Sequence, residues 1–271
     1  MTNPLPYPLL SYAGRTVVVT GAATGMGAAP VAHLLEAGAE VYALDIAEVT
    51  TSVTSAQHVD LGDPASIDGV LDGLPPRIDA LMHCAGIPGG TRFGPRTVVR
   101  VNFLGLRHLT EAVFDRMGDD ASITSIASIA GGGWPSHQTE LSELLATNAF
   151  LGMYAASKHA VVGLSEALHR ELEPTPIGVS CLCPELVSTA IFDVARLRPD
   201  WVEVDETNDA TQASLAEILA ERGIGTDVVA DRVVDAVRTG RCWVFTHDVT
   251  LPAALRRFED LQAGRSPTGL A

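Results

Sequence analysis

Residues 16–27 read Thr-Val-Val-Val-Thr-Gly-Ala-Ala-Thr-Gly-Met-Gly, and the expected fold follows from this stretch. The β-branched run Thr16–Val19 is typical of a strand buried on both sides in a parallel sheet. A glycine-rich turn follows, and residues 28–37 then have helical spacing that ends at Gly38. Pro30 is compatible with this helix only if its missing N–H lies in the first turn. The stretch therefore predicts a strand, a tight turn and a helix in direct succession.

The turn contains three glycines, Gly21, Gly25 and Gly27, at places where close backbone contacts are expected. Gly21 allows the tight turn, Gly25 lets the backbone approach a diphosphate, and Gly27 lets the helix pack close to the sheet. The helix start adds free N–H groups and a partial positive charge. We therefore predict that the turn, with Thr24 and Met26, binds the diphosphate of a dinucleotide. A turn without a ligand is the alternative.

Asp45 follows the second predicted strand, Val41–Leu44, and lies 18 residues after Gly27. A carboxylate at this place accepts hydrogen bonds from a ribose diol and repels a 2′-phosphate. Ile46 comes next and the glycine-rich turn contains no Lys or Arg, so the sequence favours NAD over NADP. An aspartate solvated in a loop is the alternative. The pair Asp60-Leu61 follows another short strand and is a candidate for contact with the adenine.

Strand-like and helix-like segments alternate along the rest of the chain, which predicts an α/β fold with a parallel sheet covered on both faces. The predicted strands are Ile78–Cys84, Ala121–Ile126, Gly178–Cys183 and Cys242–His247, and the predicted helices are Asn102–Met117, Tyr154–Leu172 and Leu251–Ala263. We see no repeat and no domain linker, so residues 1–271 are expected to form one domain. Residues 1–13 are proline-rich and predict a surface arm, and residues 185–225 contain no predicted strand and predict a helical flap.

Composition narrows the possible partners and the compartment. The formal net charge is −15, which argues against nucleic acid or an anionic membrane as the main partner. The four cysteines, Cys84, Cys181, Cys183 and Cys242, form no CxxC pair, so we expect reduced core thiols in a cytoplasmic protein and no metal site. The segment Met1–Pro8 has neither a cationic start nor a long apolar run, so we expect neither a signal peptide nor a membrane span.

Tyr154 and Lys158 are four residues apart in a predicted helix, which places both side chains on one face. A free phenol has a pKa near ~10, and a nearby ammonium favours the phenolate and lowers that pKa. The pair is therefore a candidate general acid and base for a reaction between an alcohol and a ketone. A half-exposed helix face without chemistry is the alternative.

The motifs occur in one order across residues 15–190, and together they resemble the short-chain dehydrogenase/reductase family. The matching pieces are Thr20-Gly21-x-x-x-Gly25-x-Gly27, Asp60, Cys84-Ala85-Gly86, Asn102, Ser128, Tyr154-x-x-x-Lys158 and Pro184-x-x-Val187-x-Thr189. The resemblance implies a doubly wound Rossmann-type sheet in three α/β/α layers. It also implies nicotinamide-dependent oxidation of alcohols or reduction of ketones, by a homo-oligomer.

The same resemblance implies a role for each matching residue. Tyr154 would donate and accept the proton, and Lys158 would lower the pKa of Tyr154 and hold the nicotinamide ribose. Ser128 would hydrogen-bond the carbonyl oxygen, with Ser125 as its rival, and Asn102 would position a water, with a helix cap as its alternative role. The remaining residues would contact the cofactor, Cys84, Ala85 and Gly86 at the adenosine and Pro184, Val187 and Thr189 at the nicotinamide.

Several departures from the family pattern bear on the substrate. His83 replaces a usual asparagine, and we interpret it as a packed histidine rather than a base. Glu185 replaces a usual glycine and either lies near the nicotinamide or points to solvent. The segment 132–152 is an insertion before Tyr154, which either forms a wall of the substrate pocket or covers the long helix. Candidate apolar contacts with the substrate are Trp134, Phe150, Phe192, Trp201 and Leu215.

Insertions like this one occur in hydroxysteroid and aryl-alcohol members of the family. We therefore expect a bulky lipophilic secondary alcohol or ketone, resembling a steroid, a terpene or an aryl alcohol. Two other functions stay open. One is a nucleotide-binding sensor without turnover, and the other is an epimerase or dehydratase that oxidises its substrate only transiently.

Overall fold

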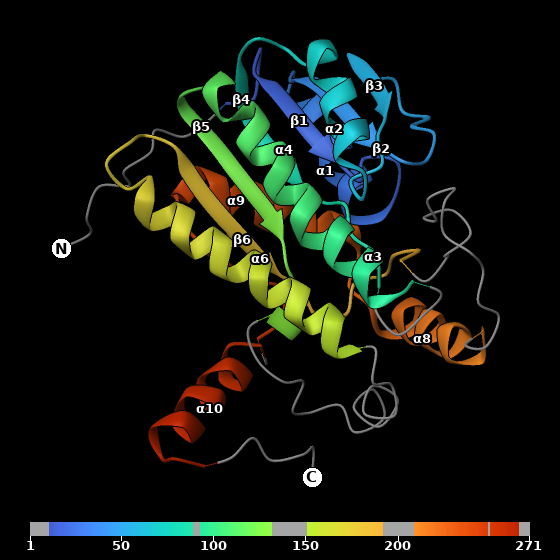
Figure 1. Cartoon of the computed structure of the whole chain (residues 1–271), viewed down its shortest axis with the longest axis vertical. Coiled ribbons are helices and arrows are strands. Elements are labelled where there is room, and N and C mark those ends of the chain that lie inside the picture. The colour runs from blue at the N-terminus through green and yellow to red at the C-terminus, as the bar shows by residue number, and fades with distance from the viewer. Residues whose placement is uncertain (1–10, 89–92, 132–150, 192–208, 249, 266–271) are drawn as a thin grey trace.

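The computed structural model describes residues 11–88, 93–131, 151–191, 209–248 and 250–265. Within them, seven strands form one sheet in the order β3-β2-β1-β4-β5-β6-β7, and each neighbouring pair is parallel. The strands are β1 (Thr16–Thr20), β2 (Glu40–Asp45), β3 (Ser55–His58), β4 (Ile78–His83), β5 (Met117–Ile126), β6 (Gly178–Cys183) and β7 (Trp243–Phe245). The predicted parallel sheet is confirmed (Figure 1).

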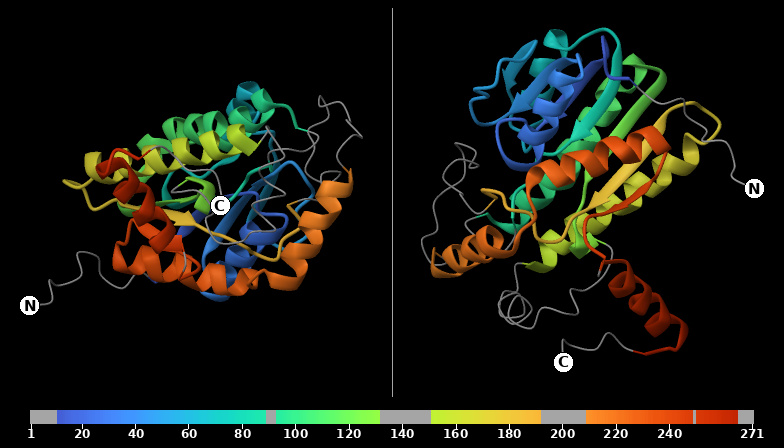
Figure 2. Two further views of the ribbon diagram at one scale, coloured as in Figure 1. Left: turned by 90° about the horizontal axis from the view of Figure 1, so that it is seen from below. Right: turned by 180° about the vertical axis from the view of Figure 1, so that it is seen from behind.

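Helices cover both faces of the sheet, so the three-layer α/β/α arrangement is also confirmed (Figures 1 and 2). One face carries α1 (Gly25–Glu36) and α9 (Thr226–Thr239), and the other carries α2 (Pro64–Val70), α4 (Leu106–Val113) and α6 (Leu151–Glu171). The remaining α-helices in the described residues are α3 (Pro95–Val99), α8 (Asp209–Arg222) and α10 (Thr250–Gln262). None of the described helices is long and apolar enough to cross a bilayer.

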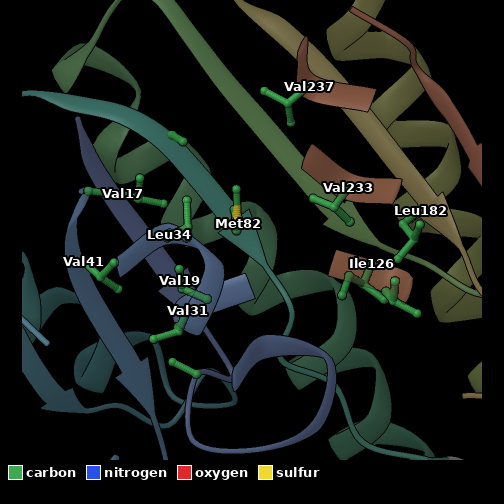
Figure 3. Close-up of a cluster of buried hydrophobic side chains, with 14 of the residues drawn as sticks. Val17, Val19, Val31, Leu34, Val41, Met82, Ile126, Leu182, Val233 and Val237 are labelled. Atoms are coloured by element: carbon green, nitrogen blue, oxygen red, sulfur yellow. The ribbon is translucent and has the colours of Figure 1, made fainter. Parts of the chain in front are cut away.

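Side chains alternate between two cores on the two faces of the sheet, as the strand repeat of two requires. Val17 and Val19 of β1 pack in the core that includes α1 and α9, and Figure 3 shows them beside Leu34 and Val31 of α1. Val18, between them, packs on the opposite face in the core that includes α4. Because both faces are buried, an uninterrupted run of valines suits this central strand.

The crevice of the fold opens where the chain changes direction across the sheet. β1 lies between β2 and β4. The chain adds β2 and β3 on one side of β1, and it then returns to add β4 and the later strands on the other side. The N–H of Gly21 donates to the carbonyl of Leu44, and the N–H of Cys84 donates to the carbonyl of Thr20. In open α/β sheets, ligands bind outside the carboxyl ends of the strands at such a switch point.

Two local expectations were wrong. Pro30 is the sixth residue of α1 rather than part of its first turn, because the helix already begins at Gly25 directly after the extended Thr24. Pro30 has no N–H, so α1 lacks one backbone hydrogen bond at this residue. The Pro30 ring is buried in the interior. The helix predicted to reach Met117 ends earlier, since Met117 already pairs with Ile78 as the first residue of β5.

The expected accessory segments are described only in part. Residues 1–10 of the arm lie outside the described residues, whereas Tyr12 is buried in the core beside α1. Most of the insertion, 132–150, and the part of the flap at 192–208 also lie outside them. The flap begins and ends at a parallel bridge between Val187 and Ile224. The helix α10 extends away from the sheet (Figure 2), and its apolar side chains Leu251, Leu255, Phe258 and Leu261 are about half exposed.

Candidate active site

The glycine-rich turn is shaped by contacts that only glycine permits. Gly21 has a φ of +69°, and a Cβ placed on it would lie 2.6 Å from the backbone nitrogen of Ala85. A Cβ on Gly27 would collide with the carbonyl oxygen of Gly21. Gly25 has a φ of +58°, and a Cβ placed on it would lie 3.4 Å from the Thr189 side chain. The turn therefore lies directly on the end of β4 and leaves the start of α1 open to a ligand.

A crevice runs along the carboxyl ends of β1, β2 and β4 and collects most of the predicted cofactor residues. The predicted residues that line it are Gly21, Thr24, Gly25, Met26, Asp45, Ile46, Asp60, Leu61, Cys84, Ala85, Gly86 and Thr189. Sequence reasoning missed the apolar residues that complete its walls, which are Leu44, Val59, Ile87, Val101, Ala190 and Ile191. Gly27 is not part of this lining and packs beneath the turn.

Asp45 is buried, with 8% of its surface exposed, so the alternative of a solvated loop aspartate is wrong. Its Oδ2 accepts a hydrogen bond of 2.8 Å from the N–H of Ala23, and its Oδ1 accepts one of 2.8 Å from the N–H of Ala47. The carboxylate thus ties the glycine-rich turn to the end of β2. Each of its oxygens has a further lone pair, which is available to accept from a ribose hydroxyl.

Asp60 and Leu61 line the crevice directly after β3. Oδ1 of Asp60 accepts from the N–H of Gly62 at 2.7 Å, and the N–H of Asp60 donates to the hydroxyl of Ser66 at 3.0 Å. The loop at this wall of the crevice is therefore held by hydrogen bonds on both sides of Asp60.

Ser128 and Tyr154 meet through a side-chain hydrogen bond beyond the end of β5. The Ser128 hydroxyl also accepts from the N–H of Ala130 at 3.2 Å. Ser125, the rival serine, is buried within β5 and paired with His83 in the sheet. The two serines therefore differ in position, and Ser128 is the one that contacts the phenol.

The pKa of Tyr154 is raised, contrary to the expectation from the sequence. Burial raises it, and the hydrogen bond with Ser128 acts in the opposite direction. The Nζ of Lys158 lies 5.8 Å from the centre of the Tyr154 ring, and its charge does not outweigh the effect of burial on the phenol. In the protein alone, Tyr154 is therefore a neutral phenol that is ready to donate a proton.

Lys158 is almost fully buried, and burial lowers its pKa from 10.5 to about 8. The thiols of Cys181, Cys183 and Cys84 are close enough to act against this shift. The Nζ donates a hydrogen bond of 2.8 Å to the carbonyl oxygen of Ile126. The ammonium is therefore held in place between the end of β5 and the phenol.

Asn102 lies inside a π-helical turn, Arg100–Gly105, and not at a helix start, so it is not a helix cap. Its Oδ1 accepts from the N–H of Ile87 at 2.8 Å, and its Nδ2 donates to the carbonyl of Ile87 at 3.0 Å and to the hydroxyl of Ser157 at 3.2 Å. Single π-helical turns of this kind occur frequently at functional sites. The turn aims the Asn102 amide at the backbone beside Gly86.

His83 is a packed histidine, as expected. Its Nε2 lies 2.9 Å from the Thr110 hydroxyl, which itself donates to the carbonyl of Leu106. The hydroxyl hydrogen is thereby used, so Nε2 must carry the proton that His83 donates to Thr110. Burial lowers the pKa of His83 to about 3, which keeps the imidazole neutral.

The residues after β6 form the opposite side of the site. The carbonyl of Pro184 accepts from the N–H of Ile129 at 2.9 Å, which joins this segment to Ser128. Two backbone hydrogen bonds join this segment to Ile224. The N–H of Ile224 donates to the carbonyl of Leu186, and the N–H of Ser188 donates to the carbonyl of Ile224. The peptide groups of Val187 itself therefore point away from Ile224.

Glu185 does not point to solvent, because its Oε2 is buried. Its N–H donates to the Thr246 hydroxyl at 3.2 Å, which joins the segment after β6 to the segment after β7. Among the described residues, no group of three His, Cys, Asp or Glu side chains is placed to hold a metal ion.

The positions that sequence reasoning missed are mostly backbone groups. The carbonyl of Ile126 and the peptide groups of Ile87 hold Lys158 and Asn102, and a backbone group leaves no mark in the sequence. Ser157 could have been found, because it stands directly before Lys158 within the Tyr154–Lys158 motif.

Comparison with known proteins identifies the family. The family model described as short chain dehydrogenase matches residues 15–199. The chain belongs to this family. It is 30% identical over 194 residues to a coniferyl-alcohol dehydrogenase from a Pseudomonas species, covering 66% of this chain and 75% of the relative. It is 30% identical over 256 residues to 1-deoxy-11-beta-hydroxypentalenate dehydrogenase from Streptomyces avermitilis, covering 86% of this chain and 84% of the relative.

A solved short-chain dehydrogenase/reductase from Burkholderia phymatum, in complex with NAD, has the same fold. Its TM-score is 0.80 at 26% identity, over 96% of this chain and 98% of that chain. This chain is therefore a short-chain dehydrogenase, an oxidoreductase that acts on alcohol or ketone groups with a nicotinamide cofactor.

Proposed function

We propose that this chain interconverts a secondary alcohol and its ketone with NAD(H), and that its substrate is a bulky lipophilic molecule of the aryl, terpene or steroid type. The single observation that carries the proposal is the hydrogen bond between Ser128 and Tyr154, with the buried ammonium of Lys158 beside it. The three groups are a neutral acid, a hydroxyl and a cation, and the Nζ of Lys158 lies beside Gly86 of the crevice.

The crevice fits a dinucleotide. Gly21 lets the turn lie against Ala85, where a Cβ would clash, and the start of α1 presents backbone N–H groups to a diphosphate. Among the described residues that line the crevice, none is Lys or Arg, and Asp45 and Ile46 stand at the ribose wall. A buried carboxylate at this wall favours a ribose diol over a 2′-phosphate, which supports NAD. The Burkholderia phymatum relative is in complex with NAD.

When bound, the nicotinamide supplies the hydride chemistry. In reduction, Tyr154 donates its phenol proton to the oxygen of the substrate while Ser128 hydrogen-bonds the same oxygen. In oxidation, the same two groups hold the alcohol and Tyr154 accepts its proton. Lys158 provides the positive charge that stabilises the phenolate and donates to the nicotinamide ribose. The N–H and carbonyl of Val187, which point away from Ile224, would hold the carboxamide of the nicotinamide.

The substrate class is supported by the relatives. The names of the two relatives refer to an aryl alcohol, coniferyl alcohol, and to a hydroxylated terpenoid acid, hydroxypentalenate. The residues that we expect at the substrate, Trp134, Phe150, Phe192 and Trp201, lie outside the described residues. Leu215 lies in α8, at the end of the flap.

We further propose a homo-oligomer, a dimer or tetramer, in the cytoplasm. Leu104, two residues after Asn102, and Met153, directly before Tyr154, are large apolar side chains that are 44% and 37% exposed. In the proposed oligomer, these side chains would be covered by another subunit. Sedimentation velocity tests the oligomer, and a monomer at micromolar concentration would contradict it.

A panel of secondary alcohols and ketones, monitored by nicotinamide absorbance with NAD(H) and with NADP(H), tests the function. We expect turnover of lipophilic aryl or terpenoid members with NAD(H). Cofactor binding without turnover of any compound would favour the sensor. Product formation without a net change in nicotinamide absorbance would favour the epimerase or dehydratase.

A further inference from the structure

We propose that Ser157 is a positioning residue that sets the rotation of the Asn102 amide beside Lys158. This inference rests on the proposed function, because it assigns a task within the same acid–base site. Ser157 lies on α6 between Tyr154 and Lys158, and only 2% of its surface is exposed. Its oxygen hydrogen-bonds the backbone carbonyl of Tyr154 and the side chain of Asn102, so we expect its effect on the site to pass through Asn102.

The direction of each hydrogen bond fixes the role of Ser157. Its hydroxyl donates to the carbonyl oxygen of Tyr154 at 2.7 Å. A hydroxyl has one hydrogen, so toward Asn102 the Ser157 oxygen can only accept. Nδ2 of Asn102 lies 3.2 Å from that oxygen and donates to it.

The hydrogen bonds between Asn102 and Ile87 require the same orientation of the amide. Its Oδ1 faces the N–H of Ile87, a donor, and its Nδ2 faces the carbonyl of Ile87, an acceptor. A rotated amide would place Nδ2 against the N–H of Ile87 and Oδ1 against two acceptors. Ser157 and Ile87 therefore permit one orientation of the amide, and it is the one that turns Oδ1 toward Gly86.

Gly86 shows where Oδ1 points. A Cβ placed on Gly86 would lie 3.4 Å from Oδ1 of Asn102 and 3.3 Å from Nζ of Lys158. The negative end of the amide dipole and the ammonium therefore border the same small space, with no side chain from Gly86 between them. In this orientation the amide stabilises the positive charge of Lys158.

The other groups that face Lys158 come from three elements. They are Cys84 after β4, Cys181 and Cys183 of β6, and Tyr154 on the same helix. Ser128 faces Tyr154 from the end of β5. Removal of the Ser157 hydroxyl leaves all of these side chains in place. It removes the bond to the Tyr154 carbonyl and one of the three hydrogen bonds of the Asn102 amide, whose bonds to Ile87 remain.

The test compares Ser157→Ala with the matched control Ser165→Ala. Ser165 is another buried serine of α6, and its hydroxyl donates to the carbonyl of Val161 at 2.8 Å. We expect Ser157→Ala to lower kcat by about tenfold to a hundredfold, with the KM values little changed, as for a small misplacement of a reacting group. The pH profile of kcat for alcohol oxidation should move to higher pH, because a less stabilised ammonium favours the phenolate less. Ser165→Ala should change neither kcat nor the pH profile.

A double substitution separates positioning from general loss of structure. If Ser157 acts through Asn102, Ser157→Ala should add nothing to the loss in Asn102→Ala. Additive losses, or a pH profile of Ser157→Ala that matches the wild type, would overturn the proposal.

Absence of turnover by the wild type with the whole panel would refute the proposed function instead. In that case the phenolate absorbance of Tyr154, obtained as the difference from Tyr154→Phe during a pH titration, decides the positioning role. A shift to higher pH in Ser157→Ala but not in Ser165→Ala supports it, and equal titrations contradict it.

Discussion

The Nζ of Lys158 donates a hydrogen bond of 2.8 Å to the carbonyl oxygen of Ile126, the last residue of β5. This bond joins α6, the helix of Tyr154 and Lys158, to the central sheet at the point where the chain turns toward Ser128. The ammonium is thus placed by the end of a strand, which is among the most rigid parts of the fold, and it does not depend on a ligand for its position.

The burial of Lys158 predicts a specific dependence of stability on pH. The unfolded chain holds this proton up to a pKa near 10.5, whereas the folded chain releases it at about 8. Between these values the unfolded state binds more protons, so the contribution of Lys158 to the free energy of unfolding rises with pH. A shift of this size corresponds to a rise on the order of 3 kcal/mol.

We expect urea unfolding between pH 7 and pH 10.5 to show this rise in the wild type relative to Lys158→Met. The comparison removes the contribution of other groups that titrate in the alkaline range. Parallel stability curves for the two proteins would show that the ammonium is not desolvated.

Gly21→Ala should destabilise the fold and abolish cofactor binding. The new Cβ would lie 2.6 Å from the Ala85 nitrogen at a residue with a φ of +69°, so both the turn and the end of β4 must move. We expect a loss of a few kcal/mol in the free energy of unfolding, of the order seen for steric strain in a core. Urea unfolding and a fluorescence titration with NADH measure the two effects.

Gly69→Ala is the matched control, because a Cβ on Gly69 would have no neighbour within 4 Å. In the helix α2 it should leave stability unchanged or raise it by up to about 1 kcal/mol. Equal behaviour of the two variants would contradict the close packing of the turn on β4.

Asp45→Arg should shift the cofactor preference toward NADP. The substitution removes the carboxylate that opposes a 2′-phosphate, but it also removes the hydrogen bonds from Ala23 and Ala47. We therefore expect weaker NAD binding together with a shift of the kcat/KM ratio by about tenfold or more, or 1.4 kcal/mol. Ile46→Arg adds the charge without removing these bonds and should give a smaller shift. A strong preference for NAD in Asp45→Arg would refute the assigned ribose contact.

Ser128→Ala and Ser125→Ala should separate the two candidate serines. Ser128 hydrogen-bonds the phenol, whereas Ser125 is buried within β5. Loss of an oxyanion donor predicts a fall in kcat of about 10²- to 10³-fold for Ser128→Ala. Its pH profile should also move to higher pH, since the Ser128 bond lowers the pKa of Tyr154. Ser125→Ala should keep the activity, and a larger loss there would reverse the assignment.

Sequence patterns predicted those parts of the molecule that depend on residue type. The β-branched run at β1 and the glycines of the turn each admit few other structures, and β6 runs from Gly178 to Cys183 as predicted. The spacing of Tyr154 and Lys158 likewise placed both on one side of α6. These features are local, so a short stretch of sequence contains the cause of each.

The features that sequence patterns did not predict depend on contacts between distant segments. The π-helical turn at Asn102 is held by the Ile87 backbone, and the raised pKa of Tyr154 results from burial by the assembled fold. Pro30 is tolerated inside α1 where it is buried against the core. In each case the deciding atom belongs to another element of the chain.

Turnover and cofactor binding by Tyr154→Phe together test the central claim, that the phenol of Tyr154 transfers the proton in the reaction. The variant removes one oxygen and keeps the ring that packs beside Lys158. We expect kcat to fall by about 10²- to 10⁴-fold, the usual contribution of a positioned acid or base. The dissociation constant for NADH, measured by fluorescence, should change little. Turnover equal to that of the wild type, with NADH still bound, would contradict the account.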